Sequence, residues 1–158
     1  MSDFGGVVMN LKCLNAEDDF SLLTVVIPAK NERVGLEKVL PELCVLGCSV
    51  IVVDDGSVDD TAAYARSLGA EVISHGRSKG NGAAVKSGIK AARTEYIGLM
   101  DGDGQHSVAG MKKLYKRLVQ DELDLLVGAR DREGQAGLGR RLANSFYNRF
   151  AGIMVGRT

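Results

Sequence analysis

Near its start the sequence reads Leu22-Leu-Thr-Val-Val-Ile-Pro28, a continuous apolar run that is rich in β-branched residues. Such a run is typical of a strand that is buried on both faces of a sheet. A helical pattern of apolar residues follows over 33–46. Pro41 is expected to kink or restart that helix, because its ring removes a backbone donor and clashes with the preceding turn. The opening of the chain therefore predicts a buried strand followed by a helix.

Strands and helices continue to alternate along the chain. Further strands are predicted at 50–53, 71–74, 96–100 and 124–129, and further helices at 59–68, 82–92 and 107–120. This alternation predicts right-handed βαβ units, and hence an α/β fold with a mostly parallel central sheet and helices on both faces. In such sheets ligands bind at the carboxyl ends of the strands. The candidate functional residues are therefore those that directly follow a strand.

Length and composition exclude several classes of protein. The chain has 158 residues, of which 45% are hydrophobic, so it is long enough for one domain with a sizeable core. Lys plus Arg and Asp plus Glu number 20 each, so the net charge is zero and no global basic field attracts nucleic acid. The longest apolar runs fall far short of the ~20 residues that a membrane-spanning helix needs. We expect neither a general nucleic-acid binder nor a protein that crosses a bilayer.

Residues 1–20 are expected to be a tail, and residues 21–158 to be the domain. The tail has no basic start and no useful apolar stretch, so it does not resemble a signal peptide, and we expect a cytoplasmic location. Cys13, Cys44 and Cys48 are an odd number of cysteines, and no His stands near the close pair to complete a metal site. We expect these thiols to be reduced and mostly packed.

A pair of carboxylates follows the predicted strand 96–100. The sequence there is Asp101-Gly-Asp103-Gly-Gln105-His106, so two carboxylates and an amide oxygen leave the strand end together. Hard oxygen ligands grouped in this way suit Mg²⁺ or Mn²⁺, which complete their shell with substrate phosphates and water. The alternative is an acidic turn in which Asp and Gly serve backbone geometry alone. A calcium loop is excluded, because Lys112 stands where that loop needs Glu.

A second acidic cluster follows an earlier predicted strand, at 50–53. In Val53-Asp-Asp-Gly-Ser-Val-Asp-Asp-Thr61, Ser57 can cap the following helix with Asp60 three residues on. Asp54 and Asp55 have no such explanation, and a charge directly after a buried strand needs a hydrogen-bonded partner. Two interpretations stay open for them: an acceptor for the N–H of a uracil or guanine base, or a plain solvated turn.

Two further loops follow predicted strands. Ile27-Pro-Ala-Lys-Asn-Glu32 ends the first strand with proline and polar residues, which is a weak signal by itself. Arg77-Ser-Lys-Gly-Asn-Gly82 brings two basic residues and two glycines to the start of a helix, where exposed N–H groups and Lys79 favour an anion such as phosphate. The spacing fits neither a Walker loop nor a dinucleotide-binding fingerprint. His75 is expected at the surface, and His106 beside the acidic loop is a residue to test.

Five motifs, taken together and in order, carry a resemblance to a known family. They are Val25-Val-Ile-Pro-Ala-Lys-Asn-Glu32, Val52-Val-Asp-Asp-Gly-Ser-Val-Asp-Asp-Thr61, Lys79-Gly-Asn-Gly-Ala-Ala84, Asp101-Gly-Asp-Gly-Gln-His106 and Leu126-Val-Gly-Ala-Arg130. From about Ser21 to its end the chain resembles the family 2 glycosyltransferases, which have the Rossmann-like GT-A fold. Within that family it is most similar to the polyprenyl-phosphate (dolichyl-phosphate) mannosyl- and glucosyltransferases.

The resemblance implies an enzyme that moves a hexose from a GDP- or UDP-sugar to a polyprenyl phosphate, with inversion at the anomeric carbon and with Mg²⁺ or Mn²⁺. It implies that Asp101, Asp103 and Gln105 hold the metal ion on the diphosphate. It also implies that either Asp54 or Asp55 meets the base. The full nucleotide-sugar site that it implies is Pro28, Ala29, Asn31, Glu32, Asp54, Asp55, Lys79, Asp101, Gly102 and Asp103.

An acceptor site after the fifth strand is a further implication of the resemblance. Arg130, Arg140, Arg141 and Ser145 match the basic and hydroxyl residues that receive the acceptor phosphate. An apolar stripe over 142–154 then lies against the membrane surface or the lipid tail, as in a peripheral protein, or packs in the core. Asp103 and Arg130 are the candidate catalytic residues. No general base is assigned, because a phosphate acceptor is already ionised.

The chain departs from the family pattern in two places. Ser107 and Val108 follow Gln-His where an acidic residue and prolines are common, although Ser107 can still cap the helix. The chain also lacks the further strand and the Ser-Gly-Phe-like segment with which the family continues. We therefore expect a truncated domain that exposes a sheet edge and either forms homo-oligomers or is a fragment. The alternative function is a non-catalytic nucleotide-sugar-binding module; a nucleotidyltransferase is disfavoured, because no glycine-rich basic signature follows the first strand.

Overall fold

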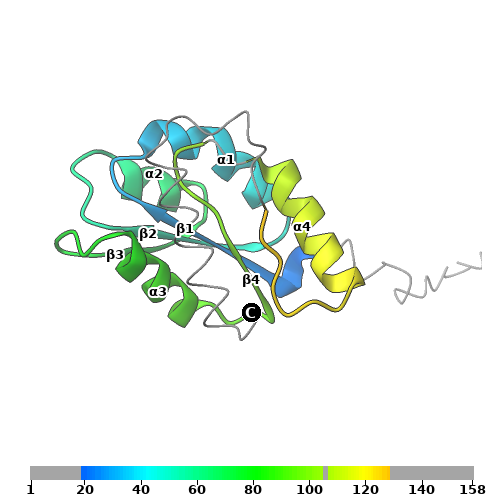
Figure 1. Cartoon of the computed structure of the whole chain (residues 1–158). Coiled ribbons are helices and arrows are strands. Elements are labelled where there is room, and N and C mark those ends of the chain that lie inside the picture. The colour runs from blue at the N-terminus through cyan, green and yellow to red at the C-terminus, as the bar shows by residue number, and fades with distance from the viewer. Residues whose placement is uncertain (1–18, 105–106, 129–158) are drawn as a thin grey trace, which may run out of the picture. The chain divides into compact units, whose positions relative to one another are not determined.

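The computed structural model describes residues 19–104 and 107–128, and its first compact unit extends to Leu126. A four-stranded sheet, with all strands parallel, forms the centre of this unit (Figure 1). In chain order the elements are the 3₁₀ helix η3 (Phe20–Leu22), β1 (Leu23–Ala29), α1 (Arg33–Val45), β2 (Ser49–Asp54), α2 (Thr61–Ser67), β3 (Glu71–Ser74), α3 (Asn81–Ala91), β4 (Tyr96–Leu99) and α4 (Val108–Gln120). The predicted α/β fold with a parallel sheet is confirmed.

The strands lie in the order β3-β2-β1-β4. The chain therefore builds the sheet outward from β1 to β3 and then crosses back, through α3, to the other side of β1. The carboxyl ends of β1 and β4 are a topological switch point, which is where α/β sheets form ligand crevices. The register pairs Ala29 with Asp54 and Asp54 with Ser74, so the segments after β1, β2 and β3 begin side by side.

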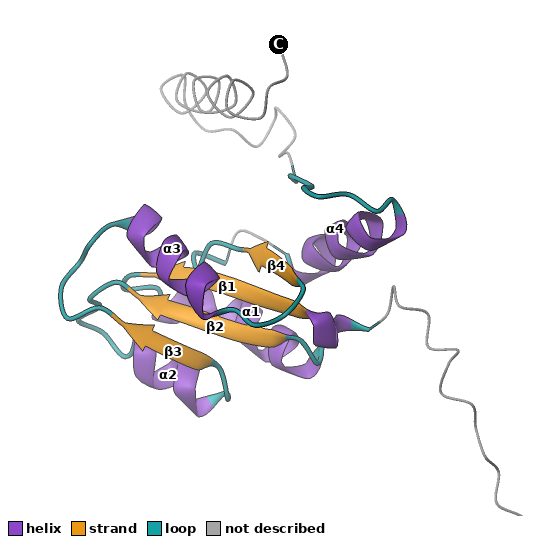
Figure 2. Ribbon diagram, turned by 90° about the horizontal axis from the view of Figure 1, so that it is seen from below, coloured by secondary structure: helices purple, strands orange, loops and turns teal. Residues whose placement is uncertain are grey.

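Helices cover both faces of the sheet, as Figure 2 shows. On one face, Leu36, Leu40 and Leu43 of α1 are fully buried in a cluster with β1, β2 and α4. Burial of each such side chain contributes about 1.5–3 kcal/mol. On the other face α3 packs against β1 and β2, and a Cβ at Gly88 would collide with Val26. Cover on both faces explains why β1 and β2 are continuous apolar runs rather than alternating ones.

The predictions for Pro41 and Ser107 can be compared with helices α1 and α4. α1 runs from Arg33 to Val45 with Pro41 inside it, so the expected restart at Pro41 is wrong. Buried leucines on both sides of the proline press the helix onto the sheet, which offsets the ~3 kcal/mol that an interior proline typically costs. Ser107 caps α4 as expected, because its hydroxyl accepts the N–H of Gly110 at 3.0 Å.

The fifth strand predicted at 124–129 is wrong for the part that the structure describes. Residues 124–128 form no strand, and Leu125 and Val127 are 71% and 73% exposed. A strand needs a neighbour that takes up its backbone N–H and C=O groups, and β4 pairs with β1 alone among the described strands. The consecutive apolar residues of this segment favour a strand, but they supply no partner for it. Ala129 lies outside the described residues.

Within the described ranges, no helix combines the length and apolar character needed to cross a membrane. Cys44 and Cys48 are free, half-buried thiols, and burial raises the pKa of both, which keeps them protonated and unreactive. The partial burial of these two thiols agrees with the expectation of packed cysteines. Cys13 lies outside the described residues.

Candidate active site

A cleft of about 320 Å³ opens at the carboxyl ends of β1 and β4, which form the switch point of the sheet. Four segments form it: the end of β1 with the loop that follows, Asp55 directly after β2, the acidic loop after β4 (residues 101–104), and the α3 loop (residues 77–80) with the first turn of α3. Its lining residues are Pro28, Ala29, Lys30, Glu32, Asp55, Ser78, Gly80, Asn81, Ala84, Asp101, Gly102 and Asp103. The cleft therefore joins strand-end motifs that are far apart in the sequence.

A second hollow of similar size, about 330 Å³, lies at the opposite end of the sheet. Thr24, Ser49 and Glu71 line it, and these residues stand at or next to the starts of β1, β2 and β3. Ligands of α/β folds bind at the carboxyl ends of the strands instead. Position and chemistry, rather than volume, single out the cleft at the switch point.

The acidic loop rests against the first turn of α1. A Cβ at Gly35 would collide with the carbonyl oxygen of Gly102 and would lie 2.8 Å from the carbonyl carbon of Asp103. Gly35 is buried, so the two backbones touch because this position has no side chain. A Cβ at Gly102 would in turn lie 3.3 Å from the carbonyl oxygen of Pro28, so the loop is wedged between α1 and the end of β1. The isolated glycine at position 35 of a predicted helix is the sequence feature that could have indicated this contact.

Asn31 ties the loop after β1 to the loop after β2. Its φ of 55° lies in the left-handed region, which Asn tolerates better than most residues do. Its N–H donates to the Ser57 hydroxyl at 2.9 Å, and its side-chain oxygen accepts the N–H of Val58 at 2.9 Å. Asn31 therefore positions one wall of the cleft through the neighbouring loop.

Ser57 does not cap the next helix, contrary to the expectation. The N-cap of α2 is Asp60, which makes no side-chain cap bond, and the N–H of Thr61 donates to Asp59 at 3.0 Å. The N–H of Ser57 donates to Asp54 at 2.9 Å, which closes the turn directly after β2. The Ser57 hydroxyl instead accepts the N–H of Asn31, because the sheet register brings the loop after β1 within hydrogen-bond distance.

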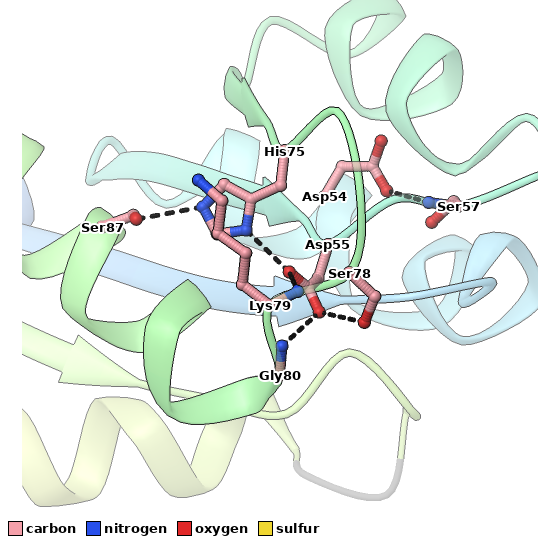
Figure 3. A network of polar contacts seen from close by, with 8 residues as sticks. All are labelled: Asp54, Asp55, Ser57, His75, Ser78, Lys79, Gly80 and Ser87. Carbon is pink, nitrogen blue, oxygen red and sulfur yellow. Dashed lines mark hydrogen bonds and ion pairs between the residues drawn. The ribbon is translucent and has the colours of Figure 1, made fainter.

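Asp55 accepts four hydrogen bonds (Figure 3). Its Oδ1 lies 2.6 Å from Nδ1 of His75 and 2.8 Å from the amide nitrogen of Lys79. Its Oδ2 lies 2.7 Å from the Ser78 hydroxyl and 2.8 Å from the amide nitrogen of Gly80. The Ser78 hydroxyl, followed by the imidazole of His75 and the Lys79 N–H, holds the pKa of Asp55 far below its usual 3.8. The four bonds occupy the acceptor positions of both oxygens.

Asp54, the last residue of β2, and Asp55, which follows it, are not part of a plain solvated turn. Asp54 and Asp55 are 7% and 4% exposed, and each accepts hydrogen bonds from the chain itself. That interpretation of the sequence is therefore wrong. Asp55 reaches the wall of the cleft, whereas Asp54 is not among the described residues that line it.

His75 is buried, although the sequence analysis expected it at the surface. Its side chain is 5% exposed, and its Nε2 lies 3.0 Å from the Ser87 hydroxyl on α3. Its N–H donates to the carbonyl of Asp54 at 2.8 Å, which extends the ladder between β2 and β3. The contact between His75 and Asp55 could have been predicted from their positions in the sequence. His75 stands directly after β3 and Asp55 directly after β2, and neighbouring parallel strands end at the same edge of the sheet.

The structure brings most of the predicted nucleotide-sugar residues into one cleft. Pro28, Ala29, Glu32, Asp55, Asp101, Gly102 and Asp103 line it, whereas Asn31, Asp54 and Lys79 stand in the same loops without lining it. Five lining residues were not predicted from the sequence: Lys30, Ser78, Gly80, Asn81 and Ala84. The predicted residues Gln105, His106, Arg130, Arg140, Arg141 and Ser145 lie outside the described residues. The acceptor site and the third metal ligand therefore stay predictions.

The donor chemistry of the acidic loop fits a hard divalent cation. Asp101 and Asp103 line the same cleft, and the backbone contact at Gly35 holds their loop. In the part of the chain that the structure describes, no three His, Cys, Asp or Glu side chains form a closed metal site. Mg²⁺ and Mn²⁺ do not require one, because one or two carboxylates suffice when substrate phosphates and water complete the shell. The residues present fit an ion that arrives with a diphosphate.

Comparison with known sequences identifies relatives of this chain. The family described as "Glycosyl transferase family 2" matches residues 24–156. Dodecaprenyl-phosphate galacturonate synthase of Rhizobium johnstonii is 30% identical over 149 residues, which cover 84% of this chain and 44% of that protein. Dolichyl-phosphate beta-glucosyltransferase of Mus musculus is 34% identical over 114 residues, which cover 61% of this chain and 35% of that protein. The chain spans about half the length of the curated relatives it matches.

Solved structures show the same architecture. The glucosyl-3-phosphoglycerate synthase of Mycobacterium tuberculosis, solved with Mn²⁺, UDP and glucosyl-3-phosphoglycerate, has a TM-score of 0.52 and 28% identity, over 65% of this chain and 39% of that chain. The mannosyl-3-phosphoglycerate synthase of Rubrobacter xylanophilus shares the fold at a TM-score of 0.52, over 65% of this chain and 36% of that chain, with 24% identity. The chain therefore belongs to glycosyl transferase family 2 and has the GT-A fold, as the order of its strand-end motifs indicated.

Proposed function

We propose that the protein transfers a hexose from a GDP- or UDP-sugar to a polyprenyl phosphate, with inversion at the anomeric carbon and with Mg²⁺ or Mn²⁺ on the diphosphate. One observation carries the proposal: Asp101 and Asp103 line the same cleft as the residues that follow β1, at the switch point of the sheet. Dodecaprenyl phosphate and dolichyl phosphate stand in the names of two relatives, which supports the acceptor. A structural neighbour solved with UDP and Mn²⁺ supports the donor and the ion.

Asp101 and Asp103, helped by Gln105, would hold the divalent ion against the donor diphosphate. When bound, the ion supplies positive charge that stabilises the departing nucleoside diphosphate. Lys30 adds a cation to the same cleft. Gly80 and Ala84 present little or no side chain there, so a diphosphate can approach the backbone at the start of α3, whose dipole favours negative charge. Direct displacement at the anomeric carbon needs no covalent intermediate with the chain.

Recognition of the base falls to Asp54 rather than Asp55 in this proposal. Asp55 has its acceptor positions occupied by four donors of the chain, so it has none left for the N–H of a base. Asp54 stands next to Asp55 without lining the cleft, and among the described residues its side chain accepts the N–H of Ser57 through Oδ1. We propose that Pro28, Ala29 and Glu32 form the wall against which the nucleoside lies.

The acceptor phosphate is assigned to Arg130, Arg140, Arg141 and Ser145. A polyprenyl phosphate is ionised near neutral pH, so it can attack the anomeric carbon without a general base on the protein. Arginines suit this task, because their planar guanidinium groups bind phosphate oxygens in pairs. The lipid tail would bring the protein to the membrane surface as a peripheral enzyme.

Calorimetric titration tests the donor site first. The protein is titrated with GDP and with UDP, each with and without Mn²⁺, and the same titrations are made with Asp103→Asn. Asp124→Asn is the matched control, because Asp124 is exposed and does not line the cleft. We expect metal-dependent binding of one nucleotide that Asp103→Asn weakens by about tenfold to a hundredfold, the range expected for loss of one charged contact. If neither nucleotide binds, or if both variants bind like the wild type, the proposed site is wrong.

A turnover assay then tests the acceptor. The protein, a nucleotide sugar of the base that binds, Mn²⁺ and a short polyprenyl phosphate in detergent are incubated, and release of the nucleoside diphosphate is measured. We expect release that depends on the polyprenyl phosphate and that falls strongly in Arg141→Gln. Binding of the nucleotide without any release would instead identify a nucleotide-sugar-binding module.

A further inference from the structure

We propose that His75 is a positioning residue of the donor cleft: it aligns Asp55 so that this carboxylate holds the α3 loop, residues 77–80, in its binding shape. His75 does not line the cleft itself. The inference rests on the proposed function, because it assigns His75 to donor binding. It goes beyond that proposal in naming a residue that acts through another residue.

His75 connects three elements of the sheet and its helices. It follows β3, its Nδ1 lies 2.6 Å from Asp55 at the end of β2, and its Nε2 lies 3.0 Å from Ser87 on α3 (Figure 3). Its backbone N–H donates to the carbonyl of Asp54 at 2.8 Å, so the main chain at this position is held as well. With 5% of the side chain exposed, the imidazole has little freedom to adopt another rotamer.

The proton positions in this network follow from the partners. An ionised Asp55 is an acceptor only, so Nδ1 of His75 must carry a hydrogen and donate it. In the neutral ring Nε2 then accepts the hydroxyl hydrogen of Ser87, and in the charged ring Nε2 donates to the same oxygen. Both charge states therefore keep the two contacts, and the ring orientation is fixed by its neighbours.

Asp55 transmits this order to the cleft wall. The same oxygen that faces His75 accepts the N–H of Lys79, and the other oxygen accepts the Ser78 hydroxyl and the N–H of Gly80. Ser78 and Gly80 line the cleft, so a rotation of the carboxylate would move residues that face the donor. A Cβ at Gly56 would lie 2.9 Å from the amide nitrogen of Ser78, so the loop also packs closely on the turn after β2.

The order Ser87, His75, Asp55 resembles a proton relay for a serine nucleophile, but the location excludes that role. Ser87 lies on α3 and lines neither the donor cleft nor the hollow at the opposite end of the sheet. A nucleophile must reach a bound substrate. The series of contacts therefore ends at a half-buried serine on α3 outside the cleft, where it can hold the imidazole in place.

Two amide variants test the contacts of the two imidazole nitrogens one at a time. In His75→Asn the amide nitrogen can take the place of Nδ1 and donate to Asp55, while the contact to Ser87 is lost. In His75→Gln the amide reaches the place of Nε2 and can meet Ser87, while the contact to Asp55 is lost. The variants are matched in chemistry, and both remove the imidazole, so a difference between them reports the contact to Asp55 rather than the loss of packing.

Three measurements are made on the wild type and both variants. They are the thermal midpoint, the amide exchange rates of Lys79 and Gly80 by NMR, and the affinity for the nucleotide that binds with Mn²⁺. We expect His75→Gln to exchange these two amides about tenfold faster and to bind about tenfold more weakly, as is typical when a supporting contact of a site is lost. In the turnover assay the loss appears in KM rather than in kcat. His75→Asn should recover most of both losses.

The result that would overturn the inference is equal behaviour of the two variants in exchange and affinity, whatever their thermal midpoints. Equal losses would mean that only the packing of the imidazole matters, and wild-type values in both would mean that His75 does not position the loop. If the wild type itself binds neither nucleotide, the proposed function fails and the assignment to donor binding fails with it. Amide exchange still decides in that case whether His75 orders the α3 loop.

Discussion

Two walls of the same cleft are held in place by opposite means. The acidic loop, residues 101–104, rests on α1 through direct backbone contact at Gly35, where no side chain intervenes. The α3 loop, residues 77–80, is instead held by the buried carboxylate of Asp55, which accepts hydrogen bonds from three of its residues. The first wall depends on shape and the second on charge. Added volume should therefore break the first wall, and neutralisation of one carboxylate should break the second.

The difference matches what each wall is proposed to do. The carboxylates of the acidic loop are proposed to bind a metal ion, so anchoring this loop through its backbone leaves that chemistry undisturbed. The α3 loop is proposed to face the diphosphate. The carboxylate of Asp55 accepts hydrogen bonds from the hydroxyl and N–H groups of this loop, and it thereby fixes the loop's conformation. Four predictions follow this contrast, from the largest expected effect to the smallest.

Gly35→Ala should have the largest effect, because its Cβ would collide with the carbonyl oxygen of Gly102. Backbone atoms cannot rotate away, so either α1 or the acidic loop must shift. We expect the free energy of unfolding to fall by about 1–3 kcal/mol, as for other overpacked sites. Metal-dependent nucleotide binding should weaken by about tenfold or more, because the carboxylates move with the loop. Denaturant unfolding and calorimetry measure the two effects.

Gly82→Ala is the matched control for that variant. Gly82 also lies in the first turn of a helix, but a Cβ there would meet no atom within 4 Å. Alanine favours the helix over glycine by about 0.5–1 kcal/mol, so this variant should be unchanged or slightly more stable. Equal stability and affinity of the two variants would show that the acidic loop is not anchored at Gly35.

Asp55→Asn should loosen the second wall. An amide has one acceptor oxygen in place of two, and its NH₂ group would face donors such as the N–H of Gly80. We expect a lower thermal midpoint and about tenfold faster amide exchange in residues 77–80, because the buried donors of the loop lose their partner. Asp60→Asn serves as the control, because Asp60 is exposed and makes no cap bond. The prediction fails if the two variants cannot be told apart.

Acid should weaken the second wall. The Ser78 hydroxyl, with His75 and the Lys79 N–H, holds the pKa of Asp55 below its usual 3.8 in the folded protein. A group with a lowered folded pKa stabilises the fold above its unfolded pKa, and this stabilisation is lost as the pH falls below that value. We therefore expect the thermal midpoint of the wild type to drop below about pH 4 more steeply than that of Asp55→Asn. Equal slopes would contradict the assignment.

The pH dependence of the wild type has to be compared with that of Asp55→Asn, because Asp59 also contributes to acid unfolding. Its hydrogen bond with the Thr61 hydroxyl also lowers its pKa, so it contributes to acid unfolding in both proteins. The difference between the wild type and Asp55→Asn removes this shared contribution. It therefore reports Asp55 alone.

Asn31→Gly should have the smallest effect, because two changes oppose each other. Glycine accommodates the φ of 55° without strain, but it loses the bond from the side-chain oxygen to the N–H of Val58. We expect a net change within about 0.5 kcal/mol in denaturant unfolding. Asn31→Ala loses the bond and is strained at this φ, so it should cost about 1–2 kcal/mol. Similar values for both variants would mean that the backbone angle does not matter here.

Much of the fold could be predicted from local pattern. The run at 22–28 became β1 over Leu23–Ala29, and the pattern at 33–46 became α1 over Arg33–Val45. These predictions succeed because burial on both faces requires a continuous apolar run and burial of one helix face requires a helical period, and both patterns are visible in the sequence. The site also followed largely from the rule that parallel strands end at one edge, which placed Asp55, Asp101 and Asp103 in one cleft.

The errors share one cause, which is that a local pattern does not name a partner. The segment 124–128 has consecutive apolar residues but forms no strand, because no described neighbour takes up its backbone groups. Ser57 has the spacing of a helix cap, yet it accepts the N–H of Asn31 from another loop. His75 is a lone polar residue in the sequence, yet the end of β2 supplies it with a carboxylate.

The sequence by itself determined the order of strands and helices, the parallel sheet and the set of polar residues at the strand ends, because hydrophobic periodicity and strand-end position are local properties. Only the tertiary structure decided which of those residues face a ligand and which hold the loops that do. Asp54 and Asp55 are adjacent carboxylates at the end of the same strand, but only the side chain of Asp55 meets His75 and the α3 loop. That choice depends on the register of three strands and on the close packing of glycines, and both are set by contacts between residues far apart in the chain.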